Sequence, residues 1–254
     1  MRTPARSQIV VPCYNEAARL DSEAFRAFAA HEPSVEFLFV NDGSSDATLA
    51  RLRELEASNR ESFAILDLPR NLGKAEAVRA GLGVAFKSNA DQVGYWDADL
   101  ATPLDEIPRF VAVLERLPKI EIVFGARVQL LGRTVRRSSA RHYLGRVFAT
   151  AVSHVLGLPI YDTQCGAKLM RRTPELAELF ATPFGVNWTF DVEILARLIQ
   201  SRRRGGRTPA AEAVYELPLE RWHDVAGSKV RPVDFLVAFF EIARIWYRYG
   251  GRGE

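Results

Sequence analysis

Residues 35–46, VEFLFVNDGSSD, hold the pattern from which the fold follows. The first seven, VEFLFVN, form an almost continuous apolar and β-prone run that turn residues then interrupt. Such runs are typical of strands buried on both faces of a parallel sheet. Similar runs predict further strands at residues 8–11, 63–68, 92–97 and 121–126.

Helical patterns lie between these predicted strands. Residues 46–58 predict a helix with leucines at three-residue spacing, and Ser44, Ser45 or Asp46 is placed to cap its N-terminus. Two more helices are expected at residues 73–90 and 105–117. Strands that alternate with helices imply right-handed βαβ units, so the fold class is α/β, with one doubly wound and mostly parallel sheet flanked by helices.

The second half of the chain is less regular. Helices are expected at residues 140–158, 189–202 and 232–249, and a strand at 213–217. The last helix is amphipathic and carries many aromatic residues, namely Phe235, Phe239, Phe240, Trp246, Tyr247 and Tyr249. Because no linker of low complexity and no repeat divides the chain, residues 1–254 are expected to form a single domain.

Composition places the chain among ordinary globular proteins, with 48% hydrophobic and 26% charged residues in 254. Its two cysteines give neither a disulfide framework nor zinc spacing, which favours a reducing, cytoplasmic location. The polar N-terminus has no secretory pattern, and no run reaches the roughly 18 apolar residues that a spanning helix needs.

Basic residues are clustered in two places. The first cluster contains no acid and comprises Arg127, Arg133, Arg136, Arg137 and Arg141; the second comprises Arg202, Arg203, Arg204 and Arg207. Such clusters suit phosphates or acidic lipid head groups, although a solvated basic face is an equal alternative for the second. The formal net charge of +3 is too small to indicate nucleic acid, which is not an expected partner.

Four polar loops follow predicted strands at their carboxyl ends, where open α/β sheets bind ligands. The loops are PCYNE at 12–16, NDGSSD at 41–46, RNLGK at 70–74 and DAD at 97–99. One polar loop is weak evidence, but four on the same edge of a sheet predict a lined crevice.

The last of these loops places two carboxylates, Asp97 and Asp99, where a strand ends. Carboxylates at this spacing can converge on one Mg²⁺ or Mn²⁺, an ion that usually bridges to substrate phosphates. The alternative is a pair of turn or capping aspartates ahead of the helix expected from residue 105.

Taken together, these motifs resemble those of family 2 glycosyltransferases, which have the GT-A fold. The segments are IVVPCYNE at 9–16, VNDGSSD at 40–46, NLGK at 71–74 and DAD at 97–99. Their order and spacing match, and the resemblance covers residues 8–240.

Within this family the chain is most similar to the polyprenyl-phosphate sugar transferases, and in particular to the dolichyl-phosphate β-glucosyltransferase branch. The supporting segments are DTQCGAKL at 162–169, WTFDVE at 188–193 and GSK at 227–229. Mannosyltransferase relatives carry Ser-Gly-Phe-Arg where this chain has residues 164–168. Ala167 departs from the glucosyl branch, which tends to have an aromatic residue there.

The resemblance implies a role for each matching residue. Pro12, Tyr14 and Glu16 would contact the base and ribose, and Asp42 the nucleobase. The nucleotide-sugar site would also contain Gly73, Lys74, Asp97 and Gln164, with Lys74 near the phosphates. Asp99 would ligate the metal directly, and Asp97 would hold ribose or metal-bound water. The alternatives are a turn with packing for Pro12 and Tyr14, and a solvated side chain for Lys74.

The implied reaction is an inverting transfer of a hexose, with UDP-glucose favoured as donor and a polyprenyl phosphate at a membrane surface as acceptor. Residues 1–127 would bind the donor and residues 128–254 the acceptor. The transition state is oxocarbenium-like, so Mg²⁺ or Mn²⁺, Lys74 and Arg127 would stabilise the leaving diphosphate. Asp191, Arg127 and Lys229 form the expected catalytic set.

Asp191 is expected to orient the acceptor or the sugar more than to remove a proton, because a phosphate monoester is largely dianionic at neutral pH. The alternative for Asp191 is an N-cap. A soluble hydroxyl acceptor, a GDP-mannose donor and a non-enzymatic nucleotide-sugar sensor are competing functions. A Rossmann dehydrogenase is excluded, since the loop at 12–16 lacks the Gly-x-Gly-x-x-Gly pattern. The sequence predicts no oligomeric state.

Overall fold

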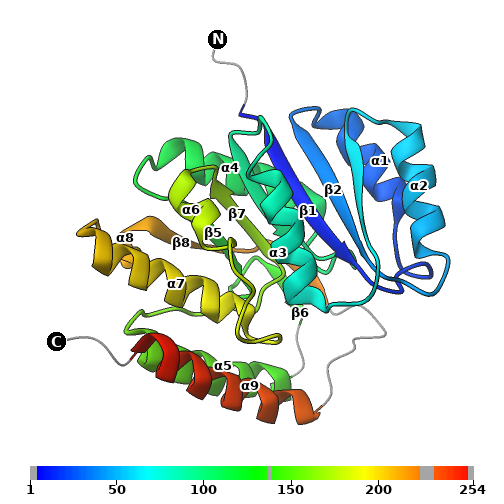
Figure 1. Cartoon of the computed structure of the whole chain (residues 1–254). Helices are drawn as coiled ribbons and strands as arrows, with labels where there is room; N and C mark the ends of the chain where they lie inside the picture. Colours follow the sequence, from blue (N-terminus) through cyan, green and yellow to red (C-terminus); the bar gives the residue numbers. More distant parts are fainter. Residues whose placement is uncertain (1–4, 137–138, 224–231, 251–254) are drawn as a thin grey trace.

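The computed structural model describes residues 5–136, 139–223 and 232–250 and is built on one seven-stranded sheet (Figure 1). The strand order is β3-β2-β1-β4-β7-β5-β8. The strands are β1 Ser7–Cys13, β2 Val35–Asp42, β3 Phe63–Leu68, β4 Gln92–Trp96, β5 Ile122–Ala126, β7 Ala167–Arg171 and β8 Val214–Pro218. All neighbours pair in parallel except β7, which is antiparallel to β4 and β5. The mostly parallel sheet expected from the sequence is therefore confirmed.

Helices cover both faces of this sheet. One face packs against α1 (Ser22–His31), α2 (Thr48–Ser58) and α4 (Ile107–Arg116), whose buried residues share a core with Ile9, Val11 and Phe39. The other packs against α3 (Lys74–Ala85), α5 (Ser139–Leu156), α7 (Phe190–Gly205) and α9 (Pro232–Ile245), with Val10 and Tyr95 in that core. Alternate residues of β1 thus face opposite cores, as a strand buried on both sides requires.

Smaller elements complete the fold. They are the 3₁₀ helix η1 (Leu104–Glu106), the short helices α6 (Pro174–Glu178) and α8 (Ala210–Ala213), and the π-helical turn η2 (Trp246–Gly250). A second, two-stranded sheet pairs β6 (Thr134–Arg136) in parallel with β9 (Arg221–His223).

The sequence-based boundaries hold to within a few residues for most elements, but several elements were missed. The helix expected at 73–90 ends at Ala85, and α1, β7 and the two-stranded sheet were not predicted. The predicted caps were also wrong in part. Ala47 is the N-cap of α2, and Asp46 accepts the Thr48 N–H from one residue further out, at 2.9 Å, while Ser44 and Ser45 bond to Asn15.

The antiparallel strand β7 can enter the centre of the sheet because β4 has a glycine there. A Cβ on Gly94 would lie 2.1 Å from the carbonyl oxygen of Lys168, far inside van der Waals contact. This close approach brings residues 162–168 of the second half against the end of β4.

Helix α9 lies beside α5 along the bottom of the view in Figure 1, below α7. Its inward side buries Ala238, Ile242 and Ile245, and Phe239 meets Phe148 of α5 edge-on at 6.3 Å. Its outward side exposes Phe240 and, in η2, Tyr247, so the expected amphipathic helix is confirmed. Among the described residues, no helix combines the length and apolarity needed to cross a membrane.

Candidate active site

The loops that follow β1 and β2 contact one another directly. Asn15 adopts a left-handed backbone conformation, with φ of 51°, and its side-chain oxygen accepts the Ser45 N–H at 2.9 Å. Ser44 Oγ in turn accepts the Asn15 N–H at 3.1 Å. Backbone in this region is uncommon for a residue other than glycine and is often found at functional sites. Two of the four predicted loops therefore form one wall.

Asp42 ties a third loop to this wall. Its two carboxylate oxygens accept the N–H groups of Leu72 and Gly73, at 2.7 and 2.9 Å, and the residue is buried. A carboxylate has about four acceptor positions, so these bonds leave capacity for a ligand. The nucleobase contact expected of Asp42 stays a prediction.

The residues after β1 differ in how far they are available to a ligand. Tyr14 is 39% exposed, and Pro12 lies half-buried in β1. Glu16 is buried and forms an ion pair with Arg19 at 2.6 Å, while its N–H donates to Thr48 Oγ1 at 2.8 Å. Tyr14 thus has a partly exposed ring at the edge of the sheet, and the Glu16 carboxylate is engaged with Arg19.

Asp97 and Lys74 meet at this edge of the sheet, although 23 positions separate them in sequence. Lys74 Nζ lies 2.6 Å from Asp97 Oδ1. Burial alone would lower the pKa of Lys74, but Asp97, Asp191 and Asp99 outweigh it and raise that pKa. The lysine is therefore a cation held among carboxylates, close to where a diphosphate would bring further negative charge.

Asp97 is also fixed from the β7 side. Its N–H donates to the Gly166 carbonyl at 2.9 Å, and a Cβ on Gly166 would lie 1.9 Å from Asp97 Oδ2. The absence of a side chain at residue 166 therefore makes the space that the Asp97 carboxylate occupies.

Asp99 completes the predicted metal pair. Its Oδ1 accepts the Ala101 N–H at 3.1 Å, and Leu100 beside it has a left-handed backbone with φ of 53°. Burial raises the pKa of Asp99, Asp97 adds to the effect, and Lys74 and Arg19 oppose it. In the described segments, no three His, Cys, Asp or Glu side chains gather closely enough to hold a metal. Two carboxylates without a third suit a Mg²⁺ or Mn²⁺ ion whose other ligands are substrate phosphates and water.

Asp191 lies in the first turn of α7 and does not act as its N-cap, which is Thr189. The Asp191 carboxylate accepts a hydrogen bond from the Tyr95 hydroxyl and pairs with Lys168 Nζ at 3.0 Å. Burial raises the pKa of Asp191, against the lowering effects of Lys168, Tyr95 and Lys74. The predicted catalytic carboxylate is therefore brought to the same edge as Lys74.

Lys168 is a functional candidate that the sequence reasoning missed. It is fully buried, and its ammonium donates to Tyr95 Oη and to the carbonyls of Thr163 and Cys165 at 2.6–3.0 Å. A fully buried lysine is rare unless it is paired. The available signal was a lysine inside the otherwise apolar run AKLM, residues 167–170.

Arg127 is held by Asp162 through three hydrogen bonds. Its Nε and Nη2 donate to the two carboxylate oxygens at 2.7 and 2.8 Å, and its backbone N–H donates at 3.0 Å. Glu216 accepts the N–H groups of Tyr161 and Asp162 and so fixes that carboxylate in place. The Arg127 charge is thus balanced before any ligand binds, and its catalytic role stays a prediction.

Near this part of the site, buried polar atoms of the described chain without a hydrogen-bond partner include Gln164 Nε2, Thr163 Oγ1 and Arg146 Nη1. The Arg146 guanidinium stacks over the Tyr161 ring at 4.0 Å. Because buried polar groups are nearly always paired, such atoms indicate contacts made by a ligand or water. Gln164 was predicted from sequence, whereas Arg146 was not.

Other predicted residues fall outside the site or outside the described residues. Lys229 lies within residues 224–231, which the structure does not describe. In the second basic cluster, Arg202 is buried and pairs with Glu121 and Glu175 at 2.6 and 3.0 Å, so that residue belongs to neither a solvated face nor an anion site.

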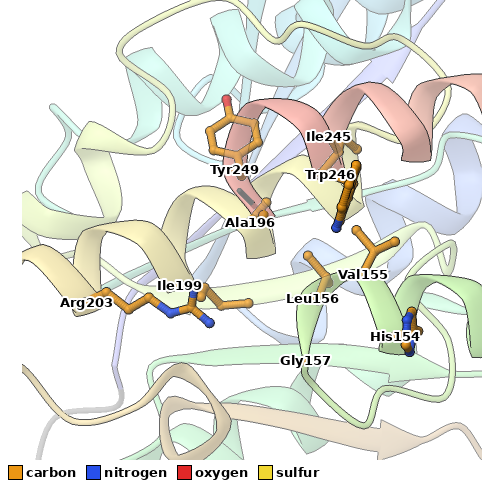
Figure 2. A pocket seen from close by; sticks show the side chains of 11 residues that line it. His154, Val155, Leu156, Gly157, Ala196, Ile199, Arg203, Ile245, Trp246 and Tyr249 are labelled. Atoms are coloured by element: carbon orange, nitrogen blue, oxygen red, sulfur yellow. The ribbon is translucent and has the colours of Figure 1, made fainter. Parts of the chain in front are cut away.

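A cavity of about 240 Å³ lies apart from these residues, between the end of α5, the part of α7 from Ala196 to Arg203 and the turn from α9 into η2 (Figure 2). Its walls include His154, Arg203, Trp246 and Tyr249, and none of the predicted site residues. Its nearest α7 residue to Asp191 is Ala196, five positions along the helix, or about 7.5 Å of rise. It is not part of the candidate site.

Comparison with known proteins agrees with the geometry. The family described as Glycosyl transferase family 2 matches residues 8–176. A dolichyl-phosphate beta-glucosyltransferase of Trichomonas vaginalis is 32% identical over 95% of this chain and 71% of its own length. The Drosophila melanogaster enzyme of that name is 31% identical over 95% and 74%. An undecaprenyl-phosphate 4-deoxy-4-formamido-L-arabinose transferase of Pseudomonas fluorescens is 34% identical over 65% and 46%.

Among solved structures, the chain is similar to glucosyl-3-phosphoglycerate synthase from Mycobacterium tuberculosis in complex with Mn²⁺, uridine diphosphate and glucosyl-3-phosphoglycerate. The TM-score is 0.64 and the identity 22%, over 98% of this chain and 82% of that one. At this identity the likeness concerns the fold alone.

Proposed function

The chain belongs to glycosyl transferase family 2, and from that premise we propose that it transfers glucose from UDP-glucose to a polyprenyl phosphate with inversion at the anomeric carbon. The observation that carries the proposal is the similarity to dolichyl-phosphate glucosyltransferases across 95% of the chain. That span includes residues 162–191, which build the Asp191 side of the crevice. Residues 1–127 would bind the donor and residues 128–254 the acceptor.

The donor would lie along the edge formed by the first three loops. Pro12, Tyr14, Glu16 and Asp42 would face the nucleoside, and Gly73 would allow the diphosphate to pass the start of α3. Lys74 opens that helix, so its ammonium and the helix N-terminus would both face the diphosphate.

Asp99, with Asp97, is proposed to hold Mg²⁺ or Mn²⁺, which when bound would neutralise charge that develops on the leaving diphosphate. Lys74 would share that task from the protein side, because it is already held as a cation by Asp97 at 2.6 Å. Arg127 would contribute through the field of its guanidinium at the end of β5.

Asp191 is proposed to position the acceptor phosphate or the sugar. Its carboxylate accepts from Tyr95 and pairs with Lys168, and these contacts hold it in a fixed orientation. A phosphate acceptor does not need a general base, because its attacking oxygen is already deprotonated at neutral pH. The bond from the anomeric carbon to the donor oxygen breaks as the phosphate oxygen attacks from the opposite face.

We also propose that α9 and η2 dock on an anionic lipid surface, which would bring the enzyme to its acceptor. Phe240, Tyr247 and Arg244 are exposed here, and Trp246 and Arg248 are partly exposed, since Trp246 also lines the cavity and Arg248 lies 3.9 Å from Glu193 of α7. Aromatic side chains with flanking arginines fit the interface of a bilayer that carries acidic head groups. A cytoplasmic location of the donor would make that surface the cytoplasmic face of a membrane.

The direct test is transfer of label from UDP-glucose to undecaprenyl or dolichyl phosphate in detergent, with Mg²⁺ or Mn²⁺. We expect an organic-soluble product that chelator and Asp99→Ala abolish and that Glu212→Ala, a change at an exposed residue of α8, preserves. UDP-glucose binding without lipid product would favour a soluble acceptor instead. Lipid product only from GDP-mannose would make the chain a mannosyltransferase.

A further inference from the structure

Glu241 of α9 binds the segment that leads into α7. Its Oε1 accepts the Asn187 N–H at 2.9 Å, and its Oε2 accepts the N–H groups of Trp188 and Thr189 at 3.0 and 2.8 Å. The Thr189 hydroxyl adds a fourth donor at 3.0 Å. One carboxylate thus holds three consecutive residues, and hydrogen bonds to a charged acceptor are the strong kind.

This contact supplies what α7 lacks in its own sequence. Thr189 is the N-cap of α7, but its side chain makes no capping bond to the helix backbone. Its hydroxyl is instead turned to Glu241. A carboxylate near a helix N-terminus is favoured by the helix dipole, so the α9 side chain stabilises the start of α7 across a tertiary contact.

The pinned segment ends two residues before Asp191. Asp191 lies in the first turn of α7, which begins directly after Thr189. From that position it bonds to Tyr95 and Lys168. A shift of the segment would therefore move the Asp191 carboxylate relative to the crevice. Misplacement of a catalytic group by about 1 Å can cost on the order of a hundredfold in rate.

A second contact runs between the same parts of the chain. Tyr249 of η2 donates to Glu193 Oε1 at 2.7 Å, and Glu193 Oε2 accepts the Gly185 N–H at 2.7 Å. The residues on either side of Asp191 are therefore bound from both α9 and η2. Glu241 is the contact that reaches the segment immediately before it.

We propose that Glu241 is a positioning residue, which sets the place of Asp191 by holding residues 187–189. The role of Glu241 in catalysis rests on the proposed function, whereas its hydrogen bonding to residues 187–189 does not. Glu241→Gln keeps the shape of the side chain but removes the charge and one acceptor oxygen, so at least two of the bonds weaken.

The test compares Glu241→Gln with wild type and with Glu212→Gln in the full chain. We expect kcat for glucose transfer to fall about tenfold or more, while Kd for UDP-glucose stays within about twofold. Trp188, which is 37% exposed, should become more accessible to acrylamide, measured as the quenching lost on Trp188→Phe in each background. Glu212→Gln should change none of these values.

An unchanged kcat, or a fall in kcat matched by an equal loss of donor affinity, would overturn the proposal. Unchanged quenching would do so too. Thr189→Val removes only the hydroxyl donor and should give a smaller fall in kcat. This variant tests the same contact even where a Glu241 variant folds poorly. Since quenching needs no turnover, absence of transfer by wild type would count against the proposed function and leave the pinning of residues 187–189 measurable.

Discussion

At the scale of single residues, the position of Asp97 depends on the absence of a side chain at Gly166. A Cβ on Gly166 would lie 1.9 Å from Asp97 Oδ2, and neither β4 nor β7 can move freely within the sheet. Gly166→Ala should therefore displace the Asp97 carboxylate, with a loss of transfer activity on the order of a hundredfold. Overpacking should also cost about 1–3 kcal/mol of stability. Initial rates and urea unfolding measure the two effects.

Gly83→Ala is the matched control for that change. Apart from the neighbouring residues and backbone of α3 itself, no atom lies within 4 Å of a Cβ built on Gly83. Alanine there should keep full activity and raise the free energy of unfolding by up to about 1 kcal/mol. Equal loss of activity in both variants would show that the Asp97 contact is not the cause.

Lys168 should contribute to stability mainly by balancing the charge of the buried Asp191 carboxylate. Lys168→Met leaves the buried Asp191 carboxylate without its cation, which should cost about 3–5 kcal/mol in urea unfolding. Adding Asp191→Asn removes the unpaired charge, so the double variant should be more stable than Lys168→Met alone. If the two losses simply added, the ion pair would not be the interaction that matters.

At the scale of elements, the sequence predicted what local pattern determines. The run at 35–41 is apolar on both faces, and β2 occupies it with one further residue. Strand β7 was missed because Lys168 and Arg171 interrupt its apolar run. Its place between β4 and β5 depends on the room that Gly94 leaves for it, and no local pattern encodes that tertiary contact.

The candidate site divides in the same way. Asp97, Lys74 and Asp191 could be predicted because each belongs to a short motif at a strand end or a helix start. The partners that fix them could not, since Glu241 lies 50 residues beyond Asp191 and Tyr95 lies 96 before it. Such pairs depend on how α7, α9 and the sheet pack together.

Ion pairs that join elements should differ in strength according to burial. Asp162 joins the loop after α5 to Arg127 at the end of β5, and both side chains are largely buried. Asp162→Asn should cost about 3–5 kcal/mol, because it leaves a buried guanidinium without its carboxylate. Glu23→Gln in the exposed Glu23–Arg26 pair of α1 should cost less than about 1 kcal/mol. Similar costs for the two changes in urea unfolding would contradict this.

At the scale of the whole molecule, the fold separates its functions. The strand ends carry the loops proposed to bind the donor, and α5 and α9 form the lower layer in Figure 1. Helix α9 faces outward on one side and holds Glu241 against the start of α7 on the other. The helix proposed to bind the lipid therefore also contacts, through Glu241, the segment that precedes Asp191.

Membrane docking by that layer makes the last prediction. The full chain should co-sediment with vesicles that contain phosphatidylglycerol, and Phe240→Ala, Trp246→Ala and Arg244→Gln should each weaken binding. For Arg244→Gln we expect about a fivefold loss at low salt, since a basic residue near an anionic surface contributes about 1 kcal/mol. That loss should shrink as salt screens the surface.

Val84→Ala changes an exposed apolar residue of α3 and should bind as wild type does. Vesicle binding that all four variants share with wild type would place the lipid contact elsewhere on the molecule. Transfer in detergent without any vesicle binding would leave the enzyme's chemistry in place and remove α9 as its route to the acceptor.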